Sequence, residues 1–193
     1  MKKILLTYFA PFGEMNANSS EEVAKLIDLE NGDKIRLEVK YLKDFQTIKA
    51  KAFANNYDLI LMLGQARGRE AISLESRATN LNNPKAKDMD NYYPNEEIYP
   101  NSSHYLYTKL DLESIINKVS EKKVAISKNC GSYLCNYVYY CTLKELEIPS
   151  LFIHLPSFIG QDDDNRIPKM EIEEMSRIIN KIIRVISMEE DHD

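Results

Sequence analysis

The feature that most constrains the fold is a nearly continuous apolar run over residues 57–63, YDLILML, which ends at Gly64. A short run of this kind is typical of a strand that helices cover on both faces, as in the centre of an α/β sheet. Strand-like and helix-like patterns alternate along the rest of the chain. Further strands are predicted over residues 3–9, 34–42, 124–127 and 151–155, and helices over residues 19–27, 43–56, 112–120, from 132 onward and 168–186.

This order indicates a single three-layer α/β/α domain over residues 1–193, with a largely parallel or mixed central sheet and functional groups at the carboxyl ends of its strands. Ser19 and Glu22 form a capping box for the first helix, and Pro168 suits the first position of the last one. Residues 82–103 lack periodicity and predict an irregular excursion, and residues 188–193 predict an acidic, solvated tail.

The net charge of −5 argues against nucleic acid or an anionic membrane as a partner, because both attract clustered Lys and Arg. A small or neutral substrate fits better. No apolar segment reaches the length of a membrane span, and the start of the chain lacks the small-residue cleavage site of a signal peptide. The three cysteines are an odd number, which favours a reducing compartment, and we therefore expect a cytoplasmic protein. Their spacing predicts no metal site.

Cys135 is the predicted nucleophile. It follows the residues NCGSYL at a strand-to-helix junction, where Gly131 supplies a turn and Ser132 an N-cap, so that Cys135 lies in the first turn of a helix. The unpaired amides and the dipole of that turn favour a thiolate and can donate to an oxyanion. On position alone, a small buried hydrophobic cysteine remains the alternative, and Cys130 and Cys141 are assigned to that class.

His154 is the predicted general base, because it lies at the carboxyl end of the buried strand 151–155, whereas His104 falls in the excursion and His192 in the tail. Glu75 is the predicted partner that orients the histidine. It follows the turn GQARGR and lies between apolar positions, near the end of the central strand and its continuation. With 30 acidic residues in the chain, this criterion is weak, and a surface carboxylate remains the alternative.

Three separated stretches resemble the pyroglutamyl peptidase family, also called pyrrolidone-carboxylate peptidases. The first is LLTYFAPFG over residues 5–13 with Asn18 following, similar to the family's TGFxPFG…N. The second is GQARGREAISLESRATN over residues 64–80, similar to GxAxGRxxIxxERxAxN, which aligns Glu75 with the catalytic glutamate. The third combines CGSYLCNYVYY over residues 130–140 with FIHLP over residues 152–156, and it aligns Cys135 and His154 with the nucleophile and the base.

The resemblance implies a Cys-His-Glu peptidase that removes an amino-terminal 5-oxoproline (pyroglutamyl) residue from small peptides without a metal or cofactor. It also implies a homotetramer. By the same resemblance, the lactam ring would bind between pocket walls and be held by side-chain or backbone hydrogen bonds. The implied walls are Phe9, Phe12, Tyr133 and Leu134, and the implied holding residues are Asn18 and Gln65.

Departures from the family pattern leave alternatives open. The family segment ARIPDNxG is largely lost in PKAKDMDN over residues 84–91, where Lys85 takes the position of an arginine thought to support the oxyanion or the substrate. Lysine keeps the charge but not the planar fork. The alternatives are a divergent thiol amidase for another small N-acyl or cyclic amide and a non-catalytic ligand-binding relative. The peptidase mechanism requires the side chains of Cys135 and His154 to lie within about hydrogen-bond reach, with a looser geometry allowed when no ligand is bound.

Overall fold

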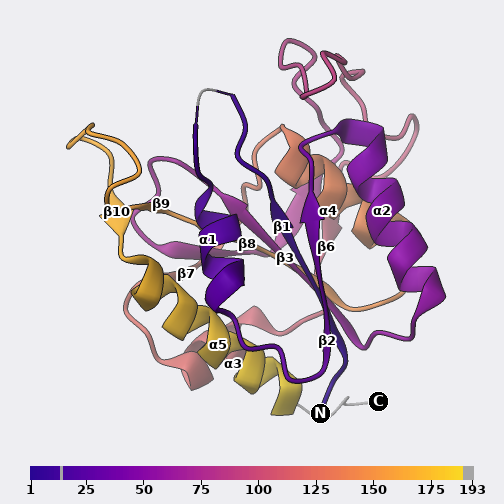
Figure 1. The fold of residues 1–193 in the computed structure, drawn as a ribbon. Helices are drawn as coiled ribbons and strands as arrows, with labels where there is room; N and C mark the ends of the chain where they lie inside the picture. The colour runs from indigo at the N-terminus through magenta and orange to yellow at the C-terminus, as the bar shows by residue number, and fades with distance from the viewer. Residues whose placement is uncertain (14, 189–193) are drawn as a thin grey trace.

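A six-stranded sheet forms the centre of the computed structural model, which describes residues 1–13 and 15–188 (Figure 1). The strand order is β2-β1-β3-β8-β4-β7. The first four strands in this order are mutually parallel, whereas β4 runs antiparallel to β8 and parallel to β7. These strands are β1 (Ile4–Phe9), β2 (Gly32–Leu37), β3 (Leu59–Gln65), β4 (Ile72–Glu75), β7 (Val124–Ser127) and β8 (Ser150–Leu155).

Two short strand pairs lie outside this sheet. One pair is antiparallel and consists of β5 (Arg77–Thr79) and β6 (Tyr105–Tyr107). The other pair is parallel and consists of β9 (Ser157–Phe158) and β10 (Lys169–Met170). The β9–β10 pair follows the carboxyl end of β8, on the side where functional groups are expected. The β5–β6 pair follows β4, which runs in the opposite direction, so this pair lies toward the other end of the sheet.

Helices cover both faces of the sheet, and the predicted three-layer α/β/α fold is confirmed. One face carries α1 (Ser19–Leu26), α3 (Leu112–Val119) and α5 (Ile172–Met188). The other face carries α2 (Tyr41–Ala54) and α4 (Leu134–Glu145). Among the described helices, none is long and apolar enough to cross a membrane.

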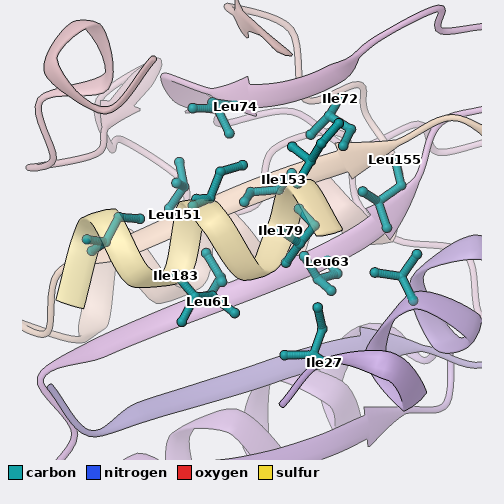
Figure 2. Packing of buried hydrophobic residues seen from close by; sticks show 14 of the residues in the cluster. Ile27, Leu61, Leu63, Ile72, Leu74, Leu151, Ile153, Leu155, Ile179 and Ile183 are labelled. Atoms are coloured by element: carbon teal, nitrogen blue, oxygen red, sulfur yellow. The ribbon is translucent and has the colours of Figure 1, made fainter. Parts of the chain in front are cut away.

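The central strand β3 explains this layering, because its side chains alternate between two apolar clusters. Leu61 and Leu63 point toward α5, where Ile179 and Ile183 pack against them (Figure 2). Ile60 and Met62 point to the opposite cluster, beneath α2 and α4. Each such buried side chain stabilises the fold by roughly 1.5–3 kcal/mol relative to an exposed one.

Two predicted N-caps and one predicted helix start are wrong. The N-cap of α1 is Asn18 rather than Ser19, because the Asn18 side chain accepts a hydrogen bond from the Ser20 amide. The N-cap of α4 is Tyr133 rather than Ser132. Pro168 does not begin the last helix, since the residues after it pair as β10 with β9 and α5 starts only at Ile172.

Residues 82–103 contain no helix or strand. The buried Asp88 carboxylate anchors this excursion by accepting hydrogen bonds from the amides of Tyr92 and of Tyr41 at the start of α2. The Tyr133 hydroxyl donates to the Lys87 carbonyl at 2.8 Å. The excursion therefore packs against the segments that begin α2 and α4. Of the predicted acidic tail, Met188 ends α5, and residues 189–193 lie outside the described residues.

Asn136, a fully buried residue of α4, joins that helix to the chain around β5. Its Oδ1 accepts from the Thr79 amide, and its Nδ2 donates to the carbonyls of Thr79 and Leu81, all at 2.8 Å. The Asn136 side chain thus forms hydrogen bonds with the backbone of this segment as a neighbouring strand would. These bonds fix α4 relative to the chain that follows β4. The sequence pattern gave no sign of it.

We expect the Asn136→Asp substitution to lower the free energy of unfolding by roughly 2–4 kcal/mol, because it removes two buried donors and leaves a carboxylate facing two carbonyls. Urea denaturation followed by circular dichroism measures this change. Asn117→Asp on the exposed surface of α3 is the matched control and should change the free energy by less than about 0.5 kcal/mol. Equal effects of the two substitutions would contradict this account of Asn136.

Candidate active site

Glu75 and His154 form a buried pair on neighbouring strands. His154 Nδ1 lies 2.7 Å from Glu75 Oε1, and the two residues are 4% and 0% exposed. Because β4 runs antiparallel to β8, the last residue of β4 lies opposite Phe152, inside the sheet rather than at its edge. Glu75 thus belongs to a separate strand, and the predicted place on a continuation of the central strand is wrong.

A third charged group completes this pair. Arg69, in the turn after β3, places its Nη1 2.9 Å from the same Glu75 oxygen. Its Nη2 donates to the Asn129 carbonyl at 2.6 Å. The Arg69 side chain is only a quarter exposed, so the ion pair is largely shielded from water.

The surroundings set the protonation of the pair. Burial alone would raise the pKa of Glu75, but the hydrogen bond with His154, the side chain of Ser127 and the charge of Arg69 outweigh it, so this pKa lies below its ordinary value. Burial lowers the pKa of His154, although Glu75 acts in the opposite direction. At neutral pH, Glu75 is therefore ionised and His154 is neutral, with the Nδ1 proton donated to Glu75 and Nε2 free to accept a proton.

Cys135 is the second residue of α4, within its first turn, and is partly exposed. A Cβ atom added to Gly64 would lie 2.9 Å from its Sγ and 2.7 Å from Cζ of Phe152. Gly64 is also the register partner of His154 across β3 and β8. The thiol thus lies over the glycine that neighbours the histidine, and only a residue without a side chain leaves room for it there.

The thiol is neutral in the free protein. Burial raises the pKa of Cys135 to about 12, and the negative charge of Glu75 acts in the same direction. Within the described residues, Cys135 makes no hydrogen bond to His154, and the two side chains line one cavity, so the predicted approach of the two groups stays a prediction. Such a contact often closes only when substrate binds.

That cavity has a volume of about 150 Å³ and brings together all six residues predicted to hold substrate, beside Cys135 and His154. Glu75 lies behind His154. Lys85 is exposed on the excursion and lies outside the set of described residues that line the cavity. The walls are mostly apolar and aromatic, and they consist of Phe9, Phe12, Asn18, Val39, Gln65, Cys130, Gly131, Ser132, Tyr133, Leu134, Cys135 and His154.

The side chains of Asn18 and Gln65 already have partners. Asn18 caps α1 and donates to the Ala10 carbonyl at 3.2 Å. Gln65 Oε1 accepts from the Ser19 amide at 2.7 Å and from Gln161 Nε2 at 2.8 Å. Both side chains therefore shape the loop between β1 and α1.

Sequence reasoning missed Val39, which lines the cavity although it follows an edge strand. Its backbone φ of +61° is unusual for a β-branched residue. The buried Asp44 carboxylate holds this turn by accepting from the amides of Glu38 and Lys40, both at 2.9 Å. No local sequence pattern predicts a valine with this left-handed backbone conformation. Arg69, by contrast, lies six residues before Glu75 in the motif GQARGREAISLESRATN. That position was the only sequence feature that could have indicated a role in the site.

Comparisons with known proteins agree with this geometry. The sequence profile of the pyroglutamyl peptidase family matches residues 2–189. The pyrrolidone-carboxylate peptidase of Staphylococcus aureus strain JH9 is 31% identical over 204 residues, which cover 97% of this chain and 95% of that protein. The enzyme of the same name from Fusobacterium nucleatum subsp. nucleatum is 31% identical over 208 residues, covering 99% and 96%.

Solved structures are similar over nearly the whole chain. The crystal structure of pyroglutamyl peptidase I from Bacillus amyloliquefaciens superposes with a TM-score of 0.90 at 26% identity, and covers 98% of this chain and 97% of that one. The pyrrolidone carboxyl peptidase of Fervidobacterium islandicum AW-1 superposes with a TM-score of 0.87 at 28% identity, with coverage of 97% and 99%.

An α/β/α fold in which a helix-borne cysteine shares a cavity with a carboxylate-bound histidine is the arrangement of a cysteine peptidase. The chain belongs to the pyroglutamyl peptidase family, whose members are cysteine exopeptidases. The family predicted from three sequence motifs is thereby confirmed.

We expect Gly64→Ala to lower kcat/KM by about 100-fold or more, because the new methyl group would displace the Cys135 thiol. Hydrolysis of a fluorogenic pyroglutamyl amide measures the loss, and thermal unfolding shows whether the variant is folded. Phe152→Leu, alone and combined with Gly64→Ala, is the control, since it relieves the contact with Phe152 but not the one with the thiol. Recovery of activity in the double variant would show that displacement of the thiol is not the cause.

Proposed function

We propose that this chain hydrolyses the bond that follows an amino-terminal pyroglutamyl residue in small peptides. The observation that carries the proposal is the buried Glu75–His154 hydrogen bond, behind the cavity into which Cys135 faces. In this proposal Cys135 is the nucleophile, His154 is the general base, and Glu75 orients the histidine. The names of the relatives and solved structures agree with the same substrate class.

The proposed reaction begins from the neutral pair. Glu75 holds Nδ1 of His154, so Nε2 is the atom that takes the proton of the Cys135 thiol. The new thiolate attacks the pyroglutamyl carbonyl and forms a C–S bond. The scissile C–N bond then breaks, and His154 returns the proton to the leaving amine. Water, with His154 again as base, hydrolyses the thioester and frees the thiol and pyroglutamate.

Stabilisation of the oxyanion is assigned mainly to the first backbone amides of α4, because these amides have no partner within the helix and carry the positive end of its dipole. Lys85 remains a proposed helper. Its exposed position means that the excursion would have to carry it toward Cys135 before it could act.

The cavity suits a compact neutral ring. Pyroglutamate is a five-membered lactam with one N–H donor and one carbonyl acceptor, and ligand pockets usually pair apolar walls with a few directed polar groups. We assign the walls to Phe9, Phe12, Tyr133 and Leu134. Asn18 and Gln65 act indirectly, because their side chains fix backbone groups that would hydrogen-bond to the lactam. A peptide with a free, charged amino terminus would lose its hydration there without a countercharge from these walls.

The remaining parts of the proposal concern the whole chain. We propose a single catalytic domain over residues 1–193, acting in the cytoplasm as a homotetramer and without metal or cofactor. Support for the domain comes from two apolar clusters on the two faces of one sheet and from the family match over residues 2–189. Support for self-association comes from the outer surface of α2, where Leu42 and Phe53 are 62% and 72% exposed.

We expect the wild-type chain to release aminocoumarin from pyroglutamyl-aminocoumarin in the presence of a reducing agent and EDTA, and Cys135→Ala to release none. Alanyl and prolyl amides should remain intact. Cys141→Ala is the matched control, because Cys141 is buried on the same helix outside the cavity and its loss should leave most of the activity. A folded wild type that cleaves only another acyl amide would instead support the thiol amidase, and binding without turnover would support a non-catalytic relative.

Light scattering of the wild type should give the mass of four chains. Leu42→Glu should lower that mass, because a charge on the exposed apolar surface of α2 opposes its burial. Lys43→Glu, at the neighbouring exposed position, is the control and should keep the wild-type mass. A monomeric wild type would exclude the proposed assembly.

A further inference from the structure

The mechanism above gives no task to Arg69, although this side chain touches the buried carboxylate. One nitrogen of its guanidinium lies 2.9 Å from Glu75 Oε1, the oxygen that also binds His154 at 2.7 Å. Another nitrogen donates to the Asn129 carbonyl at 2.6 Å. A guanidinium can serve two acceptors in one plane and stays charged at any pH at which proteins fold.

These contacts connect three separate parts of the site. Arg69 lies in the turn after β3, where its own amide donates to the Ala66 carbonyl at 3.2 Å. Glu75 ends β4, and Asn129 begins the loop that leads to the helix of Cys135. The Asn129 side chain in turn accepts a hydrogen bond from the Gly131 amide at 3.1 Å, so the connected hydrogen bonds extend toward the nucleophile.

We propose that Arg69 is a positioning residue of this catalytic site, which aligns Glu75 with His154 and supplies the fixed positive charge that keeps the buried Glu75–His154 unit electrically balanced. The inference rests on the proposed function, because it assumes that Cys135 and His154 carry the reaction. Arg69 acts through Glu75 and touches none of the atoms that the mechanism has reacting.

Charge balance explains why such a residue is needed. The titratable and charged side chains around this unit are Arg69, Cys135 and Cys130. Of the neutral groups, the Ser127 side chain also acts on the Glu75 carboxylate, and the Tyr139 hydroxyl donates to the Glu75 carbonyl at 2.9 Å. With Arg69 present, the ionised carboxylate is neutralised and His154 stays an uncharged base. Without Arg69, the carboxylate would be the one uncompensated charge in this set, and it would favour a protonated histidine and a protonated thiol.

The pKa directions agree with this geometry. Burial is the main cause that lowers the pKa of His154, and Arg69 acts in the same direction while Glu75 opposes it. Burial raises the pKa of Cys135, and so does Glu75, whereas Arg69 lowers it. Loss of the guanidinium should therefore raise both pKa values and move the acid limb of the activity profile to higher pH.

The test compares Arg69→Gln, Arg69→Lys and the control Arg77→Gln. Arg77 is a matched control because it donates to the Lys128 carbonyl at 3.0 Å and stacks on Tyr105, and within the described residues it forms no hydrogen bond or ion pair with Glu75 or His154. Two readouts are followed against pH. One is kcat and KM for pyroglutamyl-aminocoumarin, and the other is the rate at which iodoacetamide alkylates Cys135, measured by peptide mass spectrometry.

We expect Arg69→Gln to lower kcat by roughly 10-fold to 100-fold with little change in KM, because the loss is one of alignment. The acid limb of kcat/KM and the alkylation curve should both move upward by roughly 0.5–1 pH unit. Arg69→Lys should keep the wild-type position of both curves, because it keeps the positive charge. It should recover only part of kcat, since one ammonium cannot reproduce the planar geometry in which a guanidinium donates to two acceptors. Arg77→Gln should match the wild type in every readout.

The proposal is overturned if Arg69→Gln keeps the wild-type kcat and both pH curves, or if Arg77→Gln produces the same shift. Should Arg69→Gln fail to fold, Arg69→Lys decides, and an unchanged kcat in that variant counts against the positioning role. The alkylation curve separates this inference from the proposed function. A wild type that cleaves no pyroglutamyl amide defeats the function, whereas the effect of Arg69 on Cys135 can still be measured.

Discussion

Burial of the Glu75 carboxylate is the constraint on which the rest of the site depends. Removing an ionised carboxylate from water costs free energy of folding unless charged or hydrogen-bonding partners surround it. In this protein the partners come from two directions, His154 on the adjacent strand and Arg69 in a turn at the sheet's end. The reversed direction of β4 makes this possible, because its last residue then lies deep beside β8 instead of at the solvent edge.

A second constraint is the close approach of α4 to the sheet. The helix that carries Cys135 can place its thiol over β3 only because position 64 has no side chain. Asn136, the next residue of the helix, holds the chain around β5 with three short hydrogen bonds. The nucleophile is thus positioned by a glycine beneath it and an asparagine beside it, and neither group takes part in chemistry. Their tolerance to substitution is expected to be low for that reason.

The layers of the fold could be predicted from the sequence because β3 and β8 are apolar runs that stand out without any partner. The strand β4 could not, since its four residues, ISLE, become a strand only between β7 and β8, which lie much later in the chain. The N-caps of α1 and α4 each lie one residue from the predicted one, and α5 begins four residues after its predicted start because a strand pairing occupies the residues between. Glu75 was found through the motif in which it lies, because its position alone resembled that of many other carboxylates. Val39 was missed because its place on the cavity wall requires a backbone conformation that its residue type disfavours.

The neutral state of the Cys135 thiol has a consequence for how this protein withstands oxidants. Peroxide converts thiolates to sulfenic acid far more readily than it converts protonated thiols. A thiol with a pKa of about 12 is almost entirely protonated at neutral pH, so a molecule without substrate contains very little of the thiolate that reacts with peroxide. In the proposed mechanism the reactive thiolate forms when His154 takes the proton of the thiol for the attack on a substrate carbonyl. The burial that makes the nucleophile weak at rest would therefore also protect it between turnovers.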